Sequence, residues 1–221
     1  MIKRKIGVFI CVLVLCAGTL ACILHSHVLT PQQQYEKGIA LINQDDVFAT
    51  LYPSQFREGT ELIRKAARKN YAPAQFILGL LYLSEEYGMQ NLQEASRWFH
   101  RAASQGHRDA CHNLGKMYYE GKGVVRDVPE AIRWMTTAAH MGEIEDVIIL
   151  ALLYIDGDDG VPADLENSSK WFTVANLMGF PVSETPLGTF QKKTEKISRT
   201  ALKRAKTNAI EFYRQMTPSP W

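Results

Sequence analysis

Residues 120–134 read EGKGVVRDVPEAIRW, and the order of these residues predicts a loop followed by a helix. Gly121 and Gly123 suit the positive φ angles that commonly end a helix. Asp127 stands where an N-cap residue belongs, and Glu130 follows three residues later, which is the spacing of a capping box. Related stretches occur before and after this one, so the pattern repeats along the chain.

The repeat has a period of 36 residues. When residues 110–142 are aligned with residues 74–106, identical residues coincide at Ala74 and Ala110, Leu78 and Leu114, Gly79 and Gly115, Tyr82 and Tyr118, Glu94 and Glu130, Ala95 and Ala131, Arg97 and Arg133, Trp98 and Trp134, Ala102 and Ala138, Ala103 and Ala139, and Gly106 and Gly142. A third copy follows after one inserted residue in the stretch GDDGVPAD, residues 157–164. A degenerate copy comes first, in which Ala66 and Ala67 precede Ala102 and Ala103 by 36 residues.

Each copy reads as two helices joined by a loop. In the first helix Ala74, Leu78, Gly79 and Tyr82 share one face, and the small residues mark where a neighbouring helix comes close. In the second helix Ala131, Trp134, Ala138 and Ala139 form a similar stripe. A unit of this size cannot bury two apolar stripes alone, so the copies are predicted to stack on one another.

This pattern resembles the Sel-one-like repeat, a relative of the tetratricopeptide repeat. Residues 110–142 match nearly all of the family pattern, whereas the copy before them has SEEYGMQ in place of the glycine pair. The third copy departs from the pattern at Asp146, Ala151 and Asn176. The resemblance implies an all-α, right-handed solenoid of helix-turn-helix repeats that acts as an adaptor or scaffold. The predicted solenoid spans residues 31–182, with units at about 31–71, 72–107, 108–143 and 144–180.

Residues 1–28 are predicted to form a signal peptide or a transmembrane anchor. Lys3, Arg4 and Lys5 precede an uncharged, apolar run of 19 residues, Ile6–Leu24, whose length fits either alternative. The basic cluster favours a cytoplasmic N-terminus, so the repeats are expected in the periplasm, either tethered to a bacterial inner membrane or released after cleavage. A third alternative is lipidation of Cys22, because the residues before it faintly resemble a lipobox.

The net charge of +2 conceals a segregated pattern, because residues 187–216 hold eight basic and two acidic residues. Within the C-terminal segment, residues 183–221, we predict one long helix over 187–216, with Thr185 as the N-cap. Its apolar face is expected to cap the solenoid, which is compatible with a second role for its basic face. Its basic face could contact an acidic partner or anionic lipid, and the residues proposed for that contact are Lys192, Lys193, Lys196 and Arg199.

The sequence holds no recognisable set of catalytic, cofactor-binding or metal-binding residues. The six histidines lack zinc spacing, and the stretch at residues 157–164 lacks the alternating ligands of a calcium loop. Cys111 has no partner in the repeats and is interpreted as a small buried hydrophobe. Nucleic acid is not expected as a ligand, because no aromatic residues interleave with the basic ones. The sequence therefore predicts a non-enzymatic protein.

What remains is a binding surface on the first helices, which line the concave face of such a solenoid. An unidentified protein or peptide is the expected partner, bound by this face or by the basic helix. Alternatively, tight curvature of the solenoid or the long C-terminal helix could cover the apolar positions of this face. The rival hypotheses are a cell-envelope enzyme or a protein that binds cell-wall precursors, and a eukaryotic adaptor of the endoplasmic reticulum, which glycosylation of Asn167 would favour. The solvent-facing positions proposed for the partner are Ile77, Leu80, Asn113, Lys116, Ile149 and Leu152.

Overall fold

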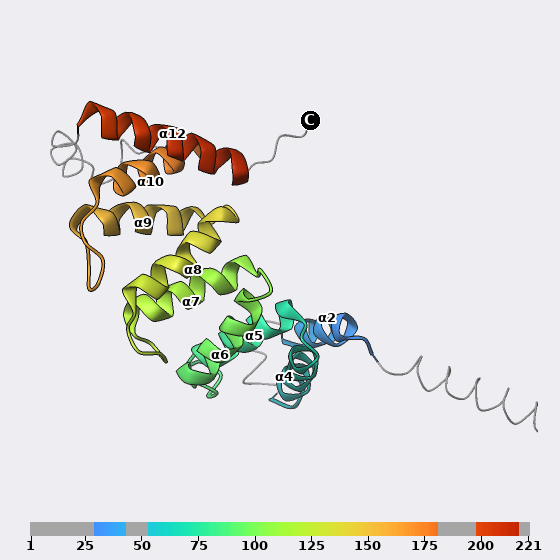
Figure 1. The fold of residues 1–221 in the computed structure, drawn as a ribbon. Helices are drawn as coiled ribbons and strands as arrows, with labels where there is room; N and C mark the ends of the chain where they lie inside the picture. Colours follow the sequence, from blue (N-terminus) through green and yellow to red (C-terminus); the bar gives the residue numbers. More distant parts are fainter. Residues whose placement is uncertain (1–28, 43–52, 181–197, 217–221) are drawn as a thin grey trace, which may run out of the picture. The chain divides into compact units, whose positions relative to one another are not determined.

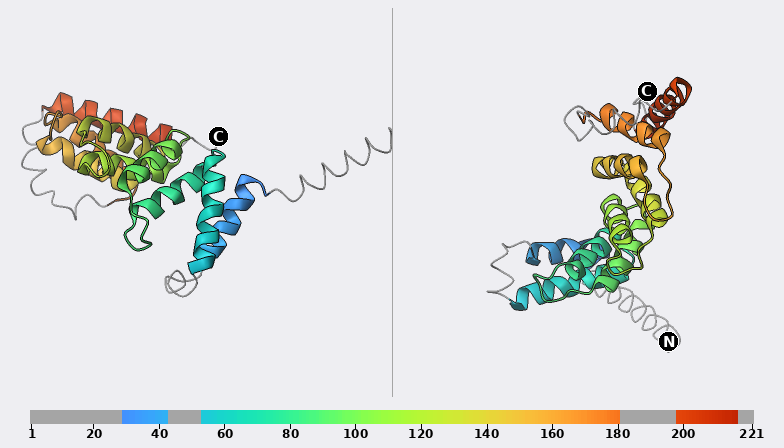
Figure 2. Two further views of the ribbon diagram at one scale, coloured as in Figure 1. Left: turned by 90° about the horizontal axis from the view of Figure 1, so that it is seen from below. Right: turned by 90° about the vertical axis from the view of Figure 1, so that its left-hand side faces the viewer.

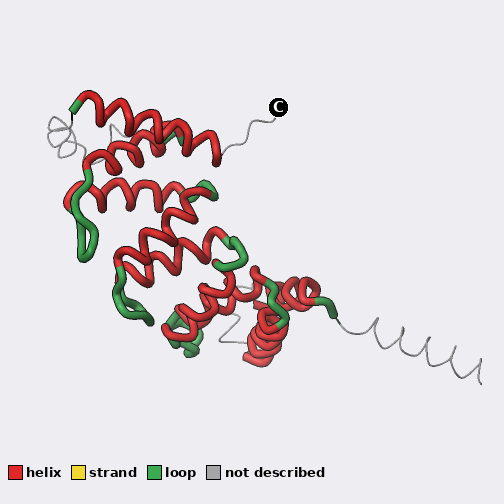
Figure 3. Tube along the Cα trace, viewed as in Figure 1, coloured by secondary structure: helices red, strands yellow, loops and turns green. Residues whose placement is uncertain are grey.

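The computed structural model of the chain describes residues 29–42, 53–180 and 198–216, and this part of the chain consists of helices and the loops between them (Figures 1 and 3). Its helices are α2 (Pro31–Ile42), α4 (Pro53–Arg68), α5 (Ala72–Leu83), α6 (Leu92–Ala103), α7 (Arg108–Glu120), α8 (Val128–His140), α9 (Ile144–Asp156), α10 (Leu165–Leu177) and α12 (Arg199–Met216). The chain divides into two compact units at Tyr71 and Ala72.

The N-terminal unit contains the hairpin of α2 and α4, whose axes come close at two glycines. A Cβ atom at Gly38 would lie 2.9 Å from the carbonyl oxygen of Gly59, so neither helix tolerates a side chain there. Asn70 has a φ of 63°, the left-handed conformation that Gly106, Gly142 and Gly179 adopt at the same position of the later copies. The degenerate first copy therefore ends in the same turn as the others.

The C-terminal unit stacks three hairpins in chain order, α5 with α6, α7 with α8, and α9 with α10, and α12 follows as the last layer (Figures 1 and 2). The same backbone hydrogen bond closes the loop of each of these three hairpins. The N–H of the N-cap residue donates to the carbonyl oxygen of the tyrosine near the end of the first helix, at 2.8 Å from Asn91 to Tyr82, 3.0 Å from Asp127 to Tyr118 and 2.8 Å from Asp164 to Tyr154.

The predicted N-cap at Asp127 forms, and the altered loops do not change the fold. The reciprocal bond of the predicted capping box is not made, because the N–H of Asp127 donates to Tyr118 and the carboxylate of Glu130 pairs with Arg133. The side chains of Asn91, Asp127 and Asp164 each accept a hydrogen bond from the N–H three residues on, at 2.9 to 3.0 Å. The loop with SEEYGMQ and the loop with the inserted residue both lead into these caps. The sequence and length of the loop thus matter less for the start of the second helix than the capping residue at the end of the loop.

The predicted continuous helix over residues 187–216 is wrong, because Ser198 is not helical and α12 begins at Arg199. The hydroxyl of Ser198 accepts a hydrogen bond of 3.2 Å from the N–H of Ala201, so this serine acts as the N-cap. The apolar face of α12 is buried at Ala205, Ala209 and Phe212. The predicted N-cap Thr185 lies outside the described residues.

Candidate functional site

The six predicted surface positions lie on the first helices of the three hairpins. Ile77 and Leu80 lie on α5, where both are half-buried. Asn113 and Lys116 lie on α7, and Ile149 and Leu152 lie on α9. Lys116 and Leu152 are exposed, with 43% of Leu152 accessible to solvent, whereas Asn113 and Ile149 are half-buried.

A cavity of about 430 Å³ brings three of these positions together between α7 and α9. Lys116, Ile149 and Leu152 contribute to its wall beside Met135 and Tyr119, so much of its surface is apolar. Its full lining is Lys116, Tyr119, Glu120, Met135, Glu145, Ile149, Leu152, Leu153, Gly157 and Asp158.

A second cavity of about 380 Å³ lies between the C-terminal ends of α5 and α7 and the loop after α5. It shares Lys116 and Glu120 with the first cavity, so the two adjoin along α7. Its full lining is Leu83, Glu85, Gln90, Leu92, Asn113, Lys116, Met117, Glu120 and Lys122. Together we call these cavities the first-helix groove. Ile77 and Leu80 line neither cavity, and Leu80 instead packs against the core beneath α6 and α7.

Charged side chains at the edge of the first-helix groove are held in pairs. Lys122 lies 2.7 Å from Glu120, and Arg126 lies 2.6 Å from Asp158 and also contacts Asp159. The hydrogen bond from Arg126 lowers the pKa of Asp158, so this carboxylate stays ionised. The contacts of Arg126 join the loop after α7 to the loop after α9 and hold one end of the groove in place.

Helix α12 packs mainly on α10 and touches α8. Both are the second helices of their hairpins. Phe212 is its main anchor, since its ring lies 4.9 Å from that of Trp171 and 4.1 Å from that of His140, measured between centroids. Lys116 and Leu152 keep their exposure in the presence of α12. The described part of the C-terminal segment thus caps the stack without burying these two groove positions.

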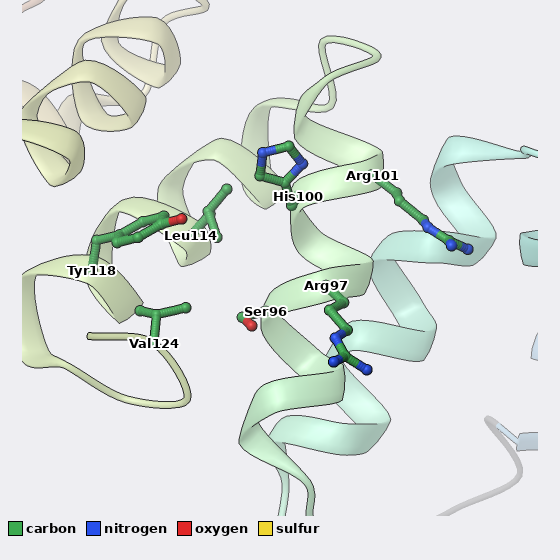
Figure 4. Close-up of a pocket in the computed structure, with 7 residues that line it drawn as sticks. All are labelled: Ser96, Arg97, His100, Arg101, Leu114, Tyr118 and Val124. Carbon is green, nitrogen blue, oxygen red and sulfur yellow. The ribbon is translucent and has the colours of Figure 1, made fainter. Parts of the chain in front are cut away.

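A third cavity, of about 310 Å³, lies between α6, α7 and the loop after α7 (Figure 4). Tyr118 and Val124 face Ser96 across it, while Arg97 and Arg101 extend away from them. Arg97 pairs with Glu94 at 2.6 Å, and the guanidinium of Arg101 lies 4.7 Å from the centre of the Trp98 ring. These arginines are therefore occupied by local contacts and do not converge on a ligand.

A buried ion pair between α7 and α9 was missed by the sequence reasoning. Nδ1 of His112 lies 3.2 Å from both carboxylate oxygens of Asp146, whose side chain is fully buried. The hydrogen bond to Asp146 raises the pKa of His112, and Glu145, 3.9 Å from Nε2, adds to the effect. The sequence feature that could have revealed this ion pair is Asp146 itself, which replaces the alanine found at positions 74 and 110.

This pair does not make a nucleophilic centre with its neighbour Cys111. Burial raises the pKa of the Cys111 thiol to about 11, so the thiolate that would act as a nucleophile is scarce at neutral pH. The thiol is fully buried, as predicted, and lies 3.8 Å from the carbonyl oxygen of Ala103. The arrangement is suited to joining two repeats rather than to acid–base chemistry on a substrate.

Other predicted features lie outside the part of the chain that the structure describes. These include the apolar run Ile6–Leu24, Cys22, and three of the four basic residues proposed for a partner, Lys192, Lys193 and Lys196. Arg199 is described and is the first residue of α12. Within the described ranges, no group of three or more histidine, cysteine or acidic side chains could hold a metal ion, and none of the helices is long and apolar enough to span a membrane.

Comparison with known families gives a match to the Sel1 repeat at residues 72–107, 108–143 and 148–180, the three hairpins of the C-terminal unit. This chain is a Sel1-like repeat protein. The degenerate first copy, residues 31–71, lies outside the family match. None of the curated proteins compared with the chain matches it.

Solved structures share the fold of this Sel1-like repeat protein. One is a protective antigen present in uropathogenic Escherichia coli strains, with an SLR fold, a TM-score of 0.62 and 26% identity. The similarity covers 86% of this chain and 39% of the antigen, so this chain matches well under half of the length of that relative. Another is a Sel1 repeat protein from Oxalobacter formigenes, with a TM-score of 0.57, 22% identity, and coverage of 85% and 87%.

Proposed function

We propose that this Sel1-like repeat protein is a non-enzymatic adaptor that binds a helix or an extended segment of a partner protein in the first-helix groove. Sel1 repeat proteins usually mediate protein–protein interactions. The observation that carries the proposal is the pair of adjoining cavities, of about 430 and 380 Å³, that share Lys116 and Glu120. Together they offer a continuous surface that crosses all three repeats.

The composition of the groove suits a peptide segment better than a small polar substrate. Leu152 is exposed beside half-buried Ile149, and apolar positions of this kind anchor amphipathic helices at helical spacing. The paired charges of Glu120 with Lys122 and of Asp158 with Arg126 lie at the edges, where they exclude ill-matched partners more than they add affinity.

The proposal places the groove outside the cytoplasm, with the chain tethered or exported through Ile6–Leu24. The support is the sequence alone, in which three basic residues precede an uncharged run long enough to span a bilayer. A partner in the cell envelope follows from this location.

A photo-reactive amino acid at Leu152 tests the proposal in the full-length chain. We expect one partner to be crosslinked at this position, and we expect Lys116→Glu to reduce the adduct by roughly tenfold, as for an interface charge next to an apolar anchor. Lys116 is exposed, so its replacement leaves the core intact.

Leu177 on α10 provides the matched control, because it is an exposed leucine on a second helix, with 37% of its surface accessible against 43% for Leu152. The same photo-reactive group at Leu177 should give no adduct with that partner. Equal adducts at both positions, or an adduct insensitive to Lys116→Glu, would show that the groove is not the binding surface.

A further inference from the structure

The outer face of α12 carries a row of cationic side chains with one aliphatic residue among them. Arg199, Lys203, Lys206 and Arg214 are all exposed, and Ile210, which is 41% exposed, lies between the last two. Their spacing of four, three, four and four residues places all five on one side of the helix. The opposite side, with Ala205, Ala209 and Phe212, is buried against the repeats.

The cations of this row have no acidic partner among the described residues. Arg204, on the flank of the helix, is the basic residue of α12 that pairs with the repeats, through Glu166 on α10. Glu211 is the single acidic residue of α12, and it lies on the same flank as Arg204. Because α12 is the last described layer of the C-terminal unit, none of the described helices of that unit covers the row (Figure 1).

We propose that this row, Arg199, Lys203, Lys206, Ile210 and Arg214, binds the surface of an anionic lipid bilayer. A line of cations with little apolar area has few of the anchors that a shaped protein interface requires, but it matches a flat, diffuse anionic surface. Ile210 is placed to enter the headgroup region while the long basic side chains extend around it.

The proximity of a membrane rests on the proposed location, because Ile6–Leu24 is the segment that would keep the chain at a bilayer. A single weak surface contact becomes effective when the protein is already tethered nearby. The row would then hold the last repeat against the membrane, while the first-helix groove lies on other helices, α5, α7 and α9, and stays available to a partner.

The test uses the full-length chain assembled into nanodiscs of phosphatidylcholine, or of phosphatidylcholine with phosphatidylglycerol. A water-soluble acylating reagent labels exposed lysines, and mass spectrometry gives the labelling rates. We expect the rates of Lys203 and Lys206 to fall by roughly fivefold in anionic discs relative to neutral ones, and to recover at about 0.5 M salt. Lys65 and Lys69 on or next to α4 are exposed internal references whose rates should not change.

Variants keep the reporter lysines and change the two arginines of the row. Arg199→Glu with Arg214→Glu should abolish the difference between the two kinds of disc. Arg57→Glu with Arg68→Glu, two exposed positions of α4, makes the same change in net charge and should leave the difference intact.

The outcomes separate this inference from the proposed anchor. Loss of the chain from neutral discs, together with protection in anionic discs, rejects the anchor and supports the lipid-binding row. Equal lysine labelling in both kinds of disc overturns the row even if the chain stays in the discs. Protection that depends on added membrane protein and not on anionic lipid assigns the row to an acidic protein, and this also overturns the proposal.

Discussion

Gly79 and Gly115 occupy the same position in two successive repeats, where the first helix comes closest to the second. A Cβ atom at Gly79 would lie 2.6 Å from the Phe99 ring, and one at Gly115 would lie 2.8 Å from Cγ of Met135. Neither glycine has a positive φ, so each is required for space rather than for backbone conformation. The third repeat has Ala151 at this position, which shows that the repeat itself accepts a methyl group when its neighbours leave room.

We expect Gly79→Ala to lower the free energy of unfolding by about 2 kcal/mol, because an aromatic ring in a packed core cannot move aside cheaply. The gain in helix propensity, about 1 kcal/mol, is too small to offset the clash. Gly115→Ala should cost less, since the flexible side chain of Met135 can change rotamer. Urea denaturation followed by circular dichroism measures both changes.

Phe99→Leu provides the control for this explanation. Combined with Gly79→Ala, it should recover part of the lost stability, giving a coupling energy of roughly 1 kcal/mol in a double-mutant cycle. Additive effects of the two substitutions, or a stabilised Gly79→Ala variant, would contradict the steric explanation.

At the scale of helices, the contact between α7 and α9 is unusual because a charged pair replaces the small residues used elsewhere. Asp146 stands at the position of Ala74 and Ala110, and it is fully buried. His112 on α7 reaches across to α9 and contacts the carboxylate of Asp146. A buried carboxylate without this partner would be strongly destabilising, so the two residues depend on one another.

This pair predicts a specific dependence of stability on pH. The hydrogen bond to Asp146 raises the pKa of His112 above its unfolded value of about 6.5. The resulting stabilisation is fully present below that value and is lost as the pH rises through the folded pKa. We expect the advantage of the wild-type chain over His112→Asn to shrink as the pH rises from roughly 6 to 9, as measured by urea denaturation.

The comparison with His112→Asn is necessary because other histidines act in the opposite direction. Burial lowers the pKa values of His107 and His140, so their contributions grow as the pH rises. Arg108, Asp109, Glu143 and Glu145 are the other charged groups near the pair, and all remain in the variant. A difference between the two proteins that is constant across this pH range would rule out the ion pair as its cause.

At the scale of the molecule, the C-terminal unit is a stack in which each hairpin contacts its neighbours. The contacts run from α6 to α7 and from α8 to α9 between hairpins, and α12 closes the end on α10. In such an array a local loss of stability spreads mainly to the adjacent layer. The far end of the stack should therefore respond little to changes at α12.

Phe212→Ala tests this expectation, because it removes the ring that packs between Trp171 and His140. We expect a loss of about 3 kcal/mol, typical of a buried phenylalanine, together with faster amide hydrogen exchange in α10 and α9. Exchange in α5 and α6 should change by much less. Gln215→Ala, at an exposed position of the same helix, should leave exchange unchanged throughout. Uniformly faster exchange in every hairpin would indicate one cooperative unit instead.

Much of this architecture could be predicted from local patterns. The spacing of Asp127 and Glu130 predicted a cap that the structure confirms, and the small residues at Gly79 and Gly115 correctly marked close helix contacts. The start of α12 was predicted wrongly, because the composition of residues 187–216 favours one long helix whereas Ser198 is not helical and α12 begins at Arg199. A single serine side chain that captures a backbone N–H was enough to decide where the helix begins.

The sequence by itself determined the repeating hairpin, because caps, turns and apolar stripes depend on residues within a few positions of one another. Only the tertiary structure decided which surface residues share a site. Lys116, Ile149 and Leu152 meet in one cavity whereas Ile77 and Leu80 do not, although all five were predicted for one face. The difference arises from the way successive repeats pack, since residues in neighbouring copies come together only through the contacts of whole helices. The same packing brought His112 to Asp146 across 34 residues of sequence.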